Sequence, residues 1–167
     1  MLLVYTGDGK GKTSACVGQA VRAVGRGLPV AFAQFMKSDM QAGEQKALAA
    51  LPGLTLHIGG RGFFLDEKDR SLHREAARRT LAWAEDHLDG LFMLVLDEIL
   101  YALQLGLITR SELEKLLAQA GRRQVHLVLS GRGLPHWLEE KADLVTEMKE
   151  IRHPWRKGVP AQPGIEF

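Results

Sequence analysis

The chain has 167 residues, of which 46% are hydrophobic and 25% are charged; these are ordinary globular values and they exclude disordered and fibrous classes. The net charge of +2 does not by itself indicate nucleic-acid binding, and no apolar run approaches the roughly 18 residues of a membrane span. We therefore expect one domain, 1–167, in the cytoplasm, with no signal peptide and no nucleic-acid or membrane partner.

The first predicted strand is the apolar run LLVY (2–5), and the stretch TGDGKGKTS (6–14) follows it directly. Glycine allows φ > 0 and a close approach of the backbone to a ligand, and successive N–H groups in such a loop form an anion-binding concavity. A helix is expected at the end of the loop, where its first N–H groups are free to bind an anion. Strand, glycine loop and helix in this order predict a phosphate-binding loop.

The loop follows the pattern G-x-x-x-x-G-K-[ST] except at its first position. Gly11, Lys12 and Thr13 fill the end of the pattern, whereas Thr6 stands where the opening glycine is expected. The glycines inside the loop make this departure tolerable. We expect Lys12 to reach a phosphate oxygen and the Thr13 hydroxyl to bind Mg²⁺; the alternative is a purely structural turn.

Hydrophobic spacing predicts three longer helices. The helix after the loop is expected to bury one face and to stop at Gly25 and Gly27. That face consists of Val17, Ala20, Val21 and Val24.

A second helix, 68–88, is indicated by the spacing of Ala77, Leu81, Ala84 and Leu88. Ser111 and Glu114 have the spacing of a capping box, which predicts the start of a third helix.

Further strands are predicted where short apolar runs alternate with these helices. They are PVAFAQF (29–35), LTLHI (54–58), LFMLVL (91–96), VHLVLS (125–130) and DLVTEM (143–148). This alternation predicts an α/β protein with a mostly parallel central sheet and helices on both faces, the three-layer RecA-like P-loop fold. Residues 152–167 are rich in proline and glycine, so we expect an irregular tail there.

Two acidic residues, Asp97 and Glu98, follow the most apolar of the predicted strands. At the carboxyl end of a strand in an open α/β sheet, both face the loop that follows the first strand. We expect that strand to neighbour 2–5, and either carboxylate to hold Mg²⁺ directly or through water. The alternative is an ordinary helix start, where the helix dipole favours acidic residues.

Several segments together resemble the ATP:corrinoid adenosyltransferases of cobalamin biosynthesis and salvage, over almost the whole chain and in the same order. They are TGDGKGKTS, AVRAVGRG (20–27), AQFMK (33–37), GFF (62–64), LDEILYALQLGL (96–107), LSGRG (129–133), ADLVTEM (142–148) and RHPWRKGVPAQPGIEF (152–167). The elements DE-x-x-YAL and HP-x-x-x-G-x-x-AQ-x-GIEF are the most specific of these.

The resemblance implies an enzyme that moves the 5′-deoxyadenosyl group of ATP to the cobalt of a reduced corrinoid, such as cob(I)yrinic acid a,c-diamide or cob(I)alamin. Triphosphate is released, and Mg²⁺ is required. Because Co(I) attacks the 5′ carbon, negative charge develops on the triphosphate, and the loop would stabilise that end. A homodimer and an electron-donating reductase or flavoprotein are also implied.

By the same resemblance, Lys12 and Glu98 have catalytic roles, and Thr13 and Glu98, with Asp97, hold the metal. The nucleotide would be contacted by Arg22 and by the loop residues Thr6, Gly7, Asp8, Gly9, Lys10, Gly11, Lys12, Thr13 and Ser14.

Phe63 and Phe64 would displace an axial cobalt ligand, which makes Co(II) easier to reduce. Phe63 matches the family pattern G-F-x-W, but Leu65 stands where the family often has Trp. The alternative for both phenylalanines is a small core cluster under a loop.

Two other functions would explain the same phosphate loop and carboxylates. One is a RecA-like ATPase, in which Glu98 would orient a water; the other is a regulatory nucleotide-binding module. Triphosphate release indicates transfer, and orthophosphate release indicates hydrolysis. If neither product is released, the protein only binds the nucleotide. The resemblance allows two acceptors, complete cobalamin and an earlier corrinoid such as cobyrinic acid diamide.

Overall fold

The computed structural model describes residues 1–38 and 42–167, and within them six strands form one parallel sheet. The strands are β1 (Leu2–Thr6), β2 (Val30–Gln34), β3 (Leu54–Ile58), β4 (Met93–Asp97), β5 (His126–Ser130) and β6 (Leu144–Glu147). Their order across the sheet is β3-β2-β4-β5-β1-β6, and every pairing is parallel. The predicted strands are confirmed, and the predicted "mostly parallel" sheet is parallel throughout.

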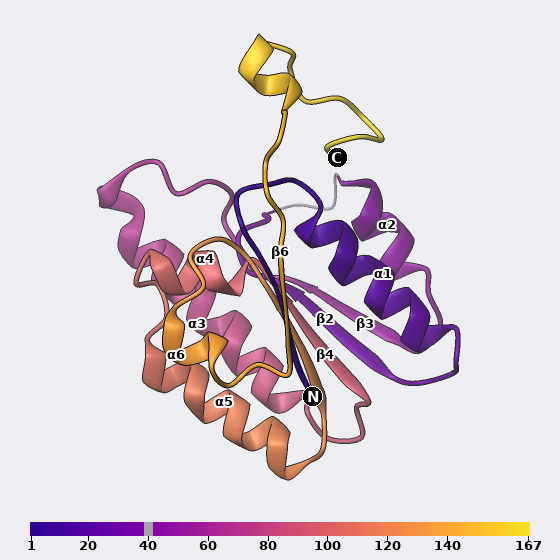
Figure 1. Cartoon of the computed structure of the whole chain (residues 1–167). Coiled ribbons are helices and arrows are strands. Elements are labelled where there is room, and N and C mark those ends of the chain that lie inside the picture. The colour runs from indigo at the N-terminus through magenta and orange to yellow at the C-terminus, as the bar shows by residue number, and fades with distance from the viewer. Residues whose placement is uncertain (39–41) are drawn as a thin grey trace.

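The helices lie on both faces of this sheet, as predicted (Figure 1). They are α1 (Lys12–Val24), α2 (Gly43–Ala49), α3 (Arg70–Asp86), α4 (Ile99–Gln104), α5 (Arg110–Arg122) and α6 (His136–Glu139), with short 3₁₀ turns η1 (Glu67–Asp69) and η2 (Pro154–Lys157). None of these helices combines the length and the apolar character that crossing a membrane requires.

Alternating side chains of the strands build a hydrophobic core on each face of the sheet. In β4, Leu94 and Leu96 join the core on the side of α3 and α5, whereas Met93 and Val95 join the core on the side of α1 and α2. This alternation follows from the two-residue period of a strand. Because helices cover both faces, the central strands β2, β4 and β5 are buried in the way that strands of parallel sheets generally are, whereas all four residues of the edge strand β6 are exposed.

The carboxyl ends of the central strands are aligned in one row. Gln34 of β2 is paired in register with Asp97 of β4, and Leu96 and Val4 are both paired with Leu129, the residue before Ser130. The strand β5 therefore lies between β1 and β4, and the expectation that β4 directly neighbours β1 is wrong. One intervening strand widens the space at this edge, and its last residue becomes part of the site.

Two local predictions are also wrong. Of the predicted buried face of α1, Ala20 is buried and Val17 and Val24 pack partly buried against the core, but Val21 is 46% exposed; Cys16 and Ala23 complete the buried face instead. The capping box of α5 is made by Thr109 and Glu112, two residues before the predicted pair. Thr109 has the extended backbone that an N-cap requires, whereas Ser111 already lies inside the helix.

The segment after β6 carries the polypeptide away from the sheet and back again. It leaves the carboxyl edge, forms the short turn η2, and returns toward the start of α1 (Figure 1). Apart from η2 it is irregular, as predicted for 152–167. Its last residues therefore lie beside the glycine loop, far away in sequence.

Candidate active site

The glycine loop between β1 and α1 is shaped by three glycines with different tasks. Gly7 (φ 98°) and Gly11 (φ 117°) adopt left-handed backbone conformations that strain any other residue. Gly9 approaches the chain after β6, where its N–H donates to the Met148 carbonyl at 2.7 Å. A Cβ atom at Gly9 would lie 2.7 Å from the same carbonyl oxygen, so no side chain fits there without a shift.

Lys12 lies at the start of α1 and turns its side chain back over the loop. Its ammonium donates to the carbonyls of Gly7 and Gly9, each at 2.7 Å. Partial burial lowers the pKa of Lys12, and the nearby charge of Arg132 lowers it further. The first N–H groups of α1 have no partner within the helix. A lysine and free N–H groups at one helix N-terminus form an anion-binding site.

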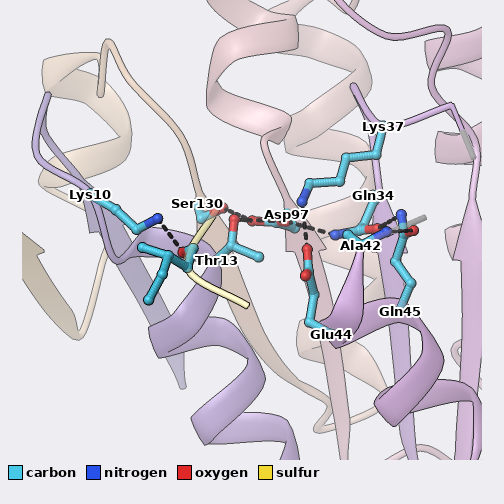
Figure 2. Close-up of polar contacts among 10 residues, drawn as sticks. Lys10, Thr13, Gln34, Lys37, Ala42, Glu44, Gln45, Asp97 and Ser130 are labelled. Atoms are coloured by element: carbon cyan, nitrogen blue, oxygen red, sulfur yellow. Dashed lines mark hydrogen bonds and ion pairs between the residues drawn. The ribbon is translucent and has the colours of Figure 1, made fainter. Parts of the chain in front are cut away.

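The buried carboxylate of Asp97 is the centre of a hydrogen-bond network (Figure 2). Ser130 Oγ donates to Asp97 Oδ1 at 2.6 Å, and Gln34 Nε2 donates to Oδ2 at 3.2 Å. Thr13 Oγ1 donates to both carboxylate oxygens, at 3.1 and 3.2 Å. Burial raises the pKa of Asp97, and these hydrogen bonds oppose the rise. Asp97 thus fixes the Thr13 hydroxyl at the mouth of the loop.

Glu98, at the N-cap of α4, has a strained backbone. Its φ is 65°, a left-handed value that costs a residue with a side chain on the order of 1–3 kcal/mol. The Ser130 hydroxyl accepts a hydrogen bond from the Glu98 N–H at 3.0 Å and thereby supports this conformation. Burial raises the pKa of Glu98 to about 7, and the neighbouring charge of Asp97 raises it as well. Strain and an unfavourable charge at one residue are typical of functional sites.

These residues line a cleft of about 670 Å³ at the carboxyl edge of the sheet. The predicted site residues that it brings together are Lys10, Gly11, Lys12, Thr13, Ser14, Phe63, Asp97 and Glu98. Lys37, paired with Glu44 at 2.5 Å, and Arg132 add positive charge to its lining.

Other predicted residues lie elsewhere. Thr6 is buried at the end of β1, and the exposed Asp8 lies 3.8 Å from Arg132 Nε. Arg22 is exposed in the last turn of α1 and donates to Gln19; ten residues of helix, about 15 Å, separate it from Lys12.

The two adjacent phenylalanines have different environments. Phe63 is 87% exposed and lines the cleft. Phe64 packs against the main core, with its ring edge-on to His73 at 5.3 Å and beneath the Arg70 guanidinium at 5.0 Å. The geometry therefore gives Phe64 a packing role and leaves Phe63 free to contact a ligand.

Sequence reasoning did not identify Ser130, Gln34, Lys37 or Arg132 as parts of the site. A signal was present for Ser130 and Gln34, because each is a polar residue that ends an apolar strand. Polar residues at the carboxyl ends of parallel strands gather at the binding edge of an α/β sheet. Lys37 and Arg132 follow the same two strands closely, in the loops that form the cleft.

The oxygen atoms at this edge suit a magnesium ion. Mg²⁺ prefers hard oxygen ligands and is commonly held by one or two carboxylates together with substrate phosphates. The Thr13 hydroxyl and the Glu98 carboxylate lie in the cleft, next to the N-terminus of α1. The donor chemistry therefore fits Mg²⁺. Asp97 lies behind Thr13 and orients the Thr13 hydroxyl.

Comparison with known proteins matches the whole chain to one family. The family described as ATP:corrinoid adenosyltransferase BtuR/CobO/CobP matches residues 1–167. A corrinoid adenosyltransferase of Pseudomonas aeruginosa is 37% identical over 174 residues, covering 100% of this chain and 83% of that protein. A corrinoid adenosyltransferase of Escherichia coli K12 is 33% identical over 169 residues, covering 100% of this chain and 85% of that protein.

Proposed function

The chain belongs to the ATP:corrinoid adenosyltransferase family, and we propose that it transfers the 5′-deoxyadenosyl group of ATP to the cobalt of a reduced corrinoid, in adenosylcobalamin biosynthesis or salvage. The observation that carries this proposal is the composition of the cleft. Lys12, Thr13 and Glu98 line its polar part, and the exposed ring of Phe63 lines the same cavity. A polar part suits a triphosphate, and an apolar part suits a corrin.

The reaction forms a cobalt–carbon bond and breaks the bond between the 5′ carbon and the triphosphate oxygen. Co(I) supplies the electron pair of the new bond, and the pair of the broken bond stays on the triphosphate. No proton is transferred, so the site needs no general base. The protein instead has to stabilise negative charge on the leaving group.

Lys12 and the N-terminus of α1 meet that requirement. The ammonium already lies between carbonyl groups of the loop, and it can turn to a phosphate oxygen that arrives there. Thr13 and Glu98 would hold Mg²⁺, with Asp97 orienting Thr13. When bound, Mg²⁺ neutralises part of the charge on the triphosphate.

Phe63 is proposed to exclude water and an axial ligand from one face of the corrin. Its exposed ring in the cleft supports this role. Leu65 is 89% exposed, so an apolar side chain is available at the position where the family often has Trp.

Further parts of the proposal concern the setting of the enzyme. We propose one nucleotide-binding domain over 1–167, because all the described strands join one sheet. Cytoplasmic location is supported by the use of ATP as co-substrate. A homodimer and a reductase or flavoprotein that supplies electrons to the corrinoid are proposed from the family resemblance alone.

An anaerobic reaction tests the proposal. The protein is mixed with ATP, Mg²⁺ and chemically reduced corrinoid, and the absorbance of the cobalt–carbon bond is followed. Parallel reactions with cobalamin and with cobyrinic acid diamide identify the preferred acceptor. Absence of a cobalt–carbon bond with both Co(I) acceptors would refute the proposed function. Hydrolysis of ATP to orthophosphate would favour the RecA-like ATPase instead.

A further inference from the structure

The last residues of the sequence line the same cleft as the glycine loop. Gly164, Ile165, Glu166 and Phe167 all contribute to its lining. Ile165 is 63% exposed and Phe167 is 46% exposed, although both side chains are apolar. Exposed apolar side chains that gather beside a cleft mark a binding surface.

A lysine of the glycine loop holds this segment in place. Lys10 Nζ donates to the Ile165 carbonyl and lies 3.1 Å from Glu166 Oε1. Glu166 Oε2 in turn accepts the Gln162 N–H at 2.8 Å. The segment is therefore a small turn that is anchored to the loop by a charged pair.

The size of the cleft limits what it can enclose. Pockets of roughly 300–1,000 Å³ enclose one ligand of drug size, which is the size class of ATP. A cleft of about 670 Å³ thus has room for the nucleotide, whose phosphates would lie on Lys12 and the start of α1. The corrin, which is larger, must lie at the mouth of the cleft. The most exposed apolar residues of the lining are the ones suited to contact it.

We propose that Ile165 and Phe167 contact the corrin ring, together with Phe63, and that the Lys10–Glu166 pair positions them. This inference rests on the proposed function and adds a second apolar segment to the acceptor site. It also changes the role of Lys10, which would anchor the corrin-contacting turn rather than bind only the nucleotide. The glycine loop and the acceptor surface would then be coupled through one side chain.

Binding measurements on the full-length protein test the contact residues. We expect Phe167→Ala and Ile165→Ala each to weaken binding of a Co(II) corrinoid about tenfold, measured by absorbance titration in the presence of ATP and Mg²⁺. The dissociation constant of ATP, measured by calorimetry, should stay within about twofold. Ile151→Ala is the matched control, because Ile151 is an apolar residue of the same irregular stretch and is 83% exposed.

Charge variants test the anchor. Glu166→Gln removes the ion pair but keeps the positive charge at Lys10, so it should weaken corrinoid binding and leave ATP binding unchanged or stronger. Lys10→Met should weaken corrinoid binding as well. The double variant Lys10→Met with Glu166→Gln should bind corrinoid as tightly as whichever single variant binds it less tightly, because both changes break the same interaction. Lys10→Arg keeps the positive charge and should therefore retain most of the wild-type affinity for corrinoid.

Two results would overturn the inference. One is a loss of ATP affinity in Phe167→Ala as large as the loss of corrinoid affinity, which would assign the segment to the nucleotide. The other is a corrinoid affinity of Phe167→Ala and Ile165→Ala that equals the affinity of the control variant Ile151→Ala. Both are binding results, so they are distinct from failure of the proposed function, which would appear as a wild-type protein that forms no cobalt–carbon bond.

Discussion

The Ser130 hydroxyl donates a hydrogen bond to Asp97 Oδ1 at 2.6 Å, across the boundary between β5 and β4. Ser130 Oγ also accepts a hydrogen bond from the N–H of Glu98, whose backbone is in the left-handed region. One buried hydroxyl thus supports both the residue that orients Thr13 and the proposed metal ligand. The position of a single side chain couples the strand edge to the proposed metal site.

We expect Ser130→Ala to raise the Mg²⁺ concentration needed for half-maximal activity about tenfold, because Asp97 and Glu98 each lose a partner. Ser130→Thr keeps the hydroxyl and is the matched control. The measurement is a Mg²⁺ titration at fixed ATP and Co(I) corrinoid. Identical titration curves for Ser130→Ala and the wild type would show that the hydroxyl does not position the metal ligands.

The two carboxylates should respond differently to neutral substitution. Glu98→Gln should weaken the response to Mg²⁺ while the protein stays folded, because Glu98 is the proposed direct ligand. Asp97→Asn should also lower the melting temperature, because its amide would meet the donors of Ser130 and Gln34. Mg²⁺ titrations and melting curves of both variants test this order. A larger Mg²⁺ defect in Asp97→Asn, with unchanged melting, would reverse the two roles.

The raised pKa of Glu98 predicts how stability depends on pH without metal or nucleotide. Between its ordinary value of 4.5 and about 7, the folded state binds more protons than the unfolded state. The free energy of unfolding therefore falls as pH rises through this window, by at most about 3 kcal/mol from this residue. Glu98→Gln removes the effect.

Chemical denaturation in EDTA at pH 5 and pH 8 measures it. The stability of Glu98→Gln relative to the wild type should increase from pH 5 to pH 8. A relative stability that is the same at both values would show that the Glu98 carboxylate is not disfavoured in the folded protein.

The phenylalanine pair offers a second contrast. Phe64→Ala should cost about 1–3 kcal/mol of stability, because Phe64 packs against the core and His73. Phe63→Ala should change stability by less than about 0.5 kcal/mol, because its ring is exposed. It should hardly affect transfer to corrinoid supplied as Co(I) but should slow the reaction that starts from Co(II) and a protein reductant. Equal rate losses in both assays, with a large fall in melting temperature, would make Phe63 a structural residue.

Local patterns in the sequence were sufficient to predict the strands and the glycine loop. Apolar runs, glycine spacing and the residues around Lys12 each act over a few positions, so they could be read without the fold. Only Val21 was wrongly expected on the buried face of α1, whose fully buried positions are the small residues Cys16, Ala20 and Ala23. Hydrophobic spacing alone does not distinguish a bulky flanking face from a small contacting one.

The contacts that complete the site connect residues far apart in sequence. Ser130 meets Asp97 only because β5 lies between β1 and β4, and strand order is not encoded in any local pattern. Lys10 meets Glu166 across 156 positions, through a segment with little regular structure. Such contacts depend on the topology of the whole chain. The sequence therefore predicted the phosphate loop, but not the contacts of β5 and of the C-terminal segment that complete the site beside it.

The products of ATP distinguish adenosyl transfer from hydrolysis most directly. Under anaerobic conditions with Mg²⁺, ATP and Co(I) corrinoid, we predict one triphosphate released for each cobalt–carbon bond formed, and loss of both products in a folded Lys12→Ala variant. Orthophosphate release that does not depend on the corrinoid, or triphosphate release at the wild-type rate by folded Lys12→Ala, would contradict the account.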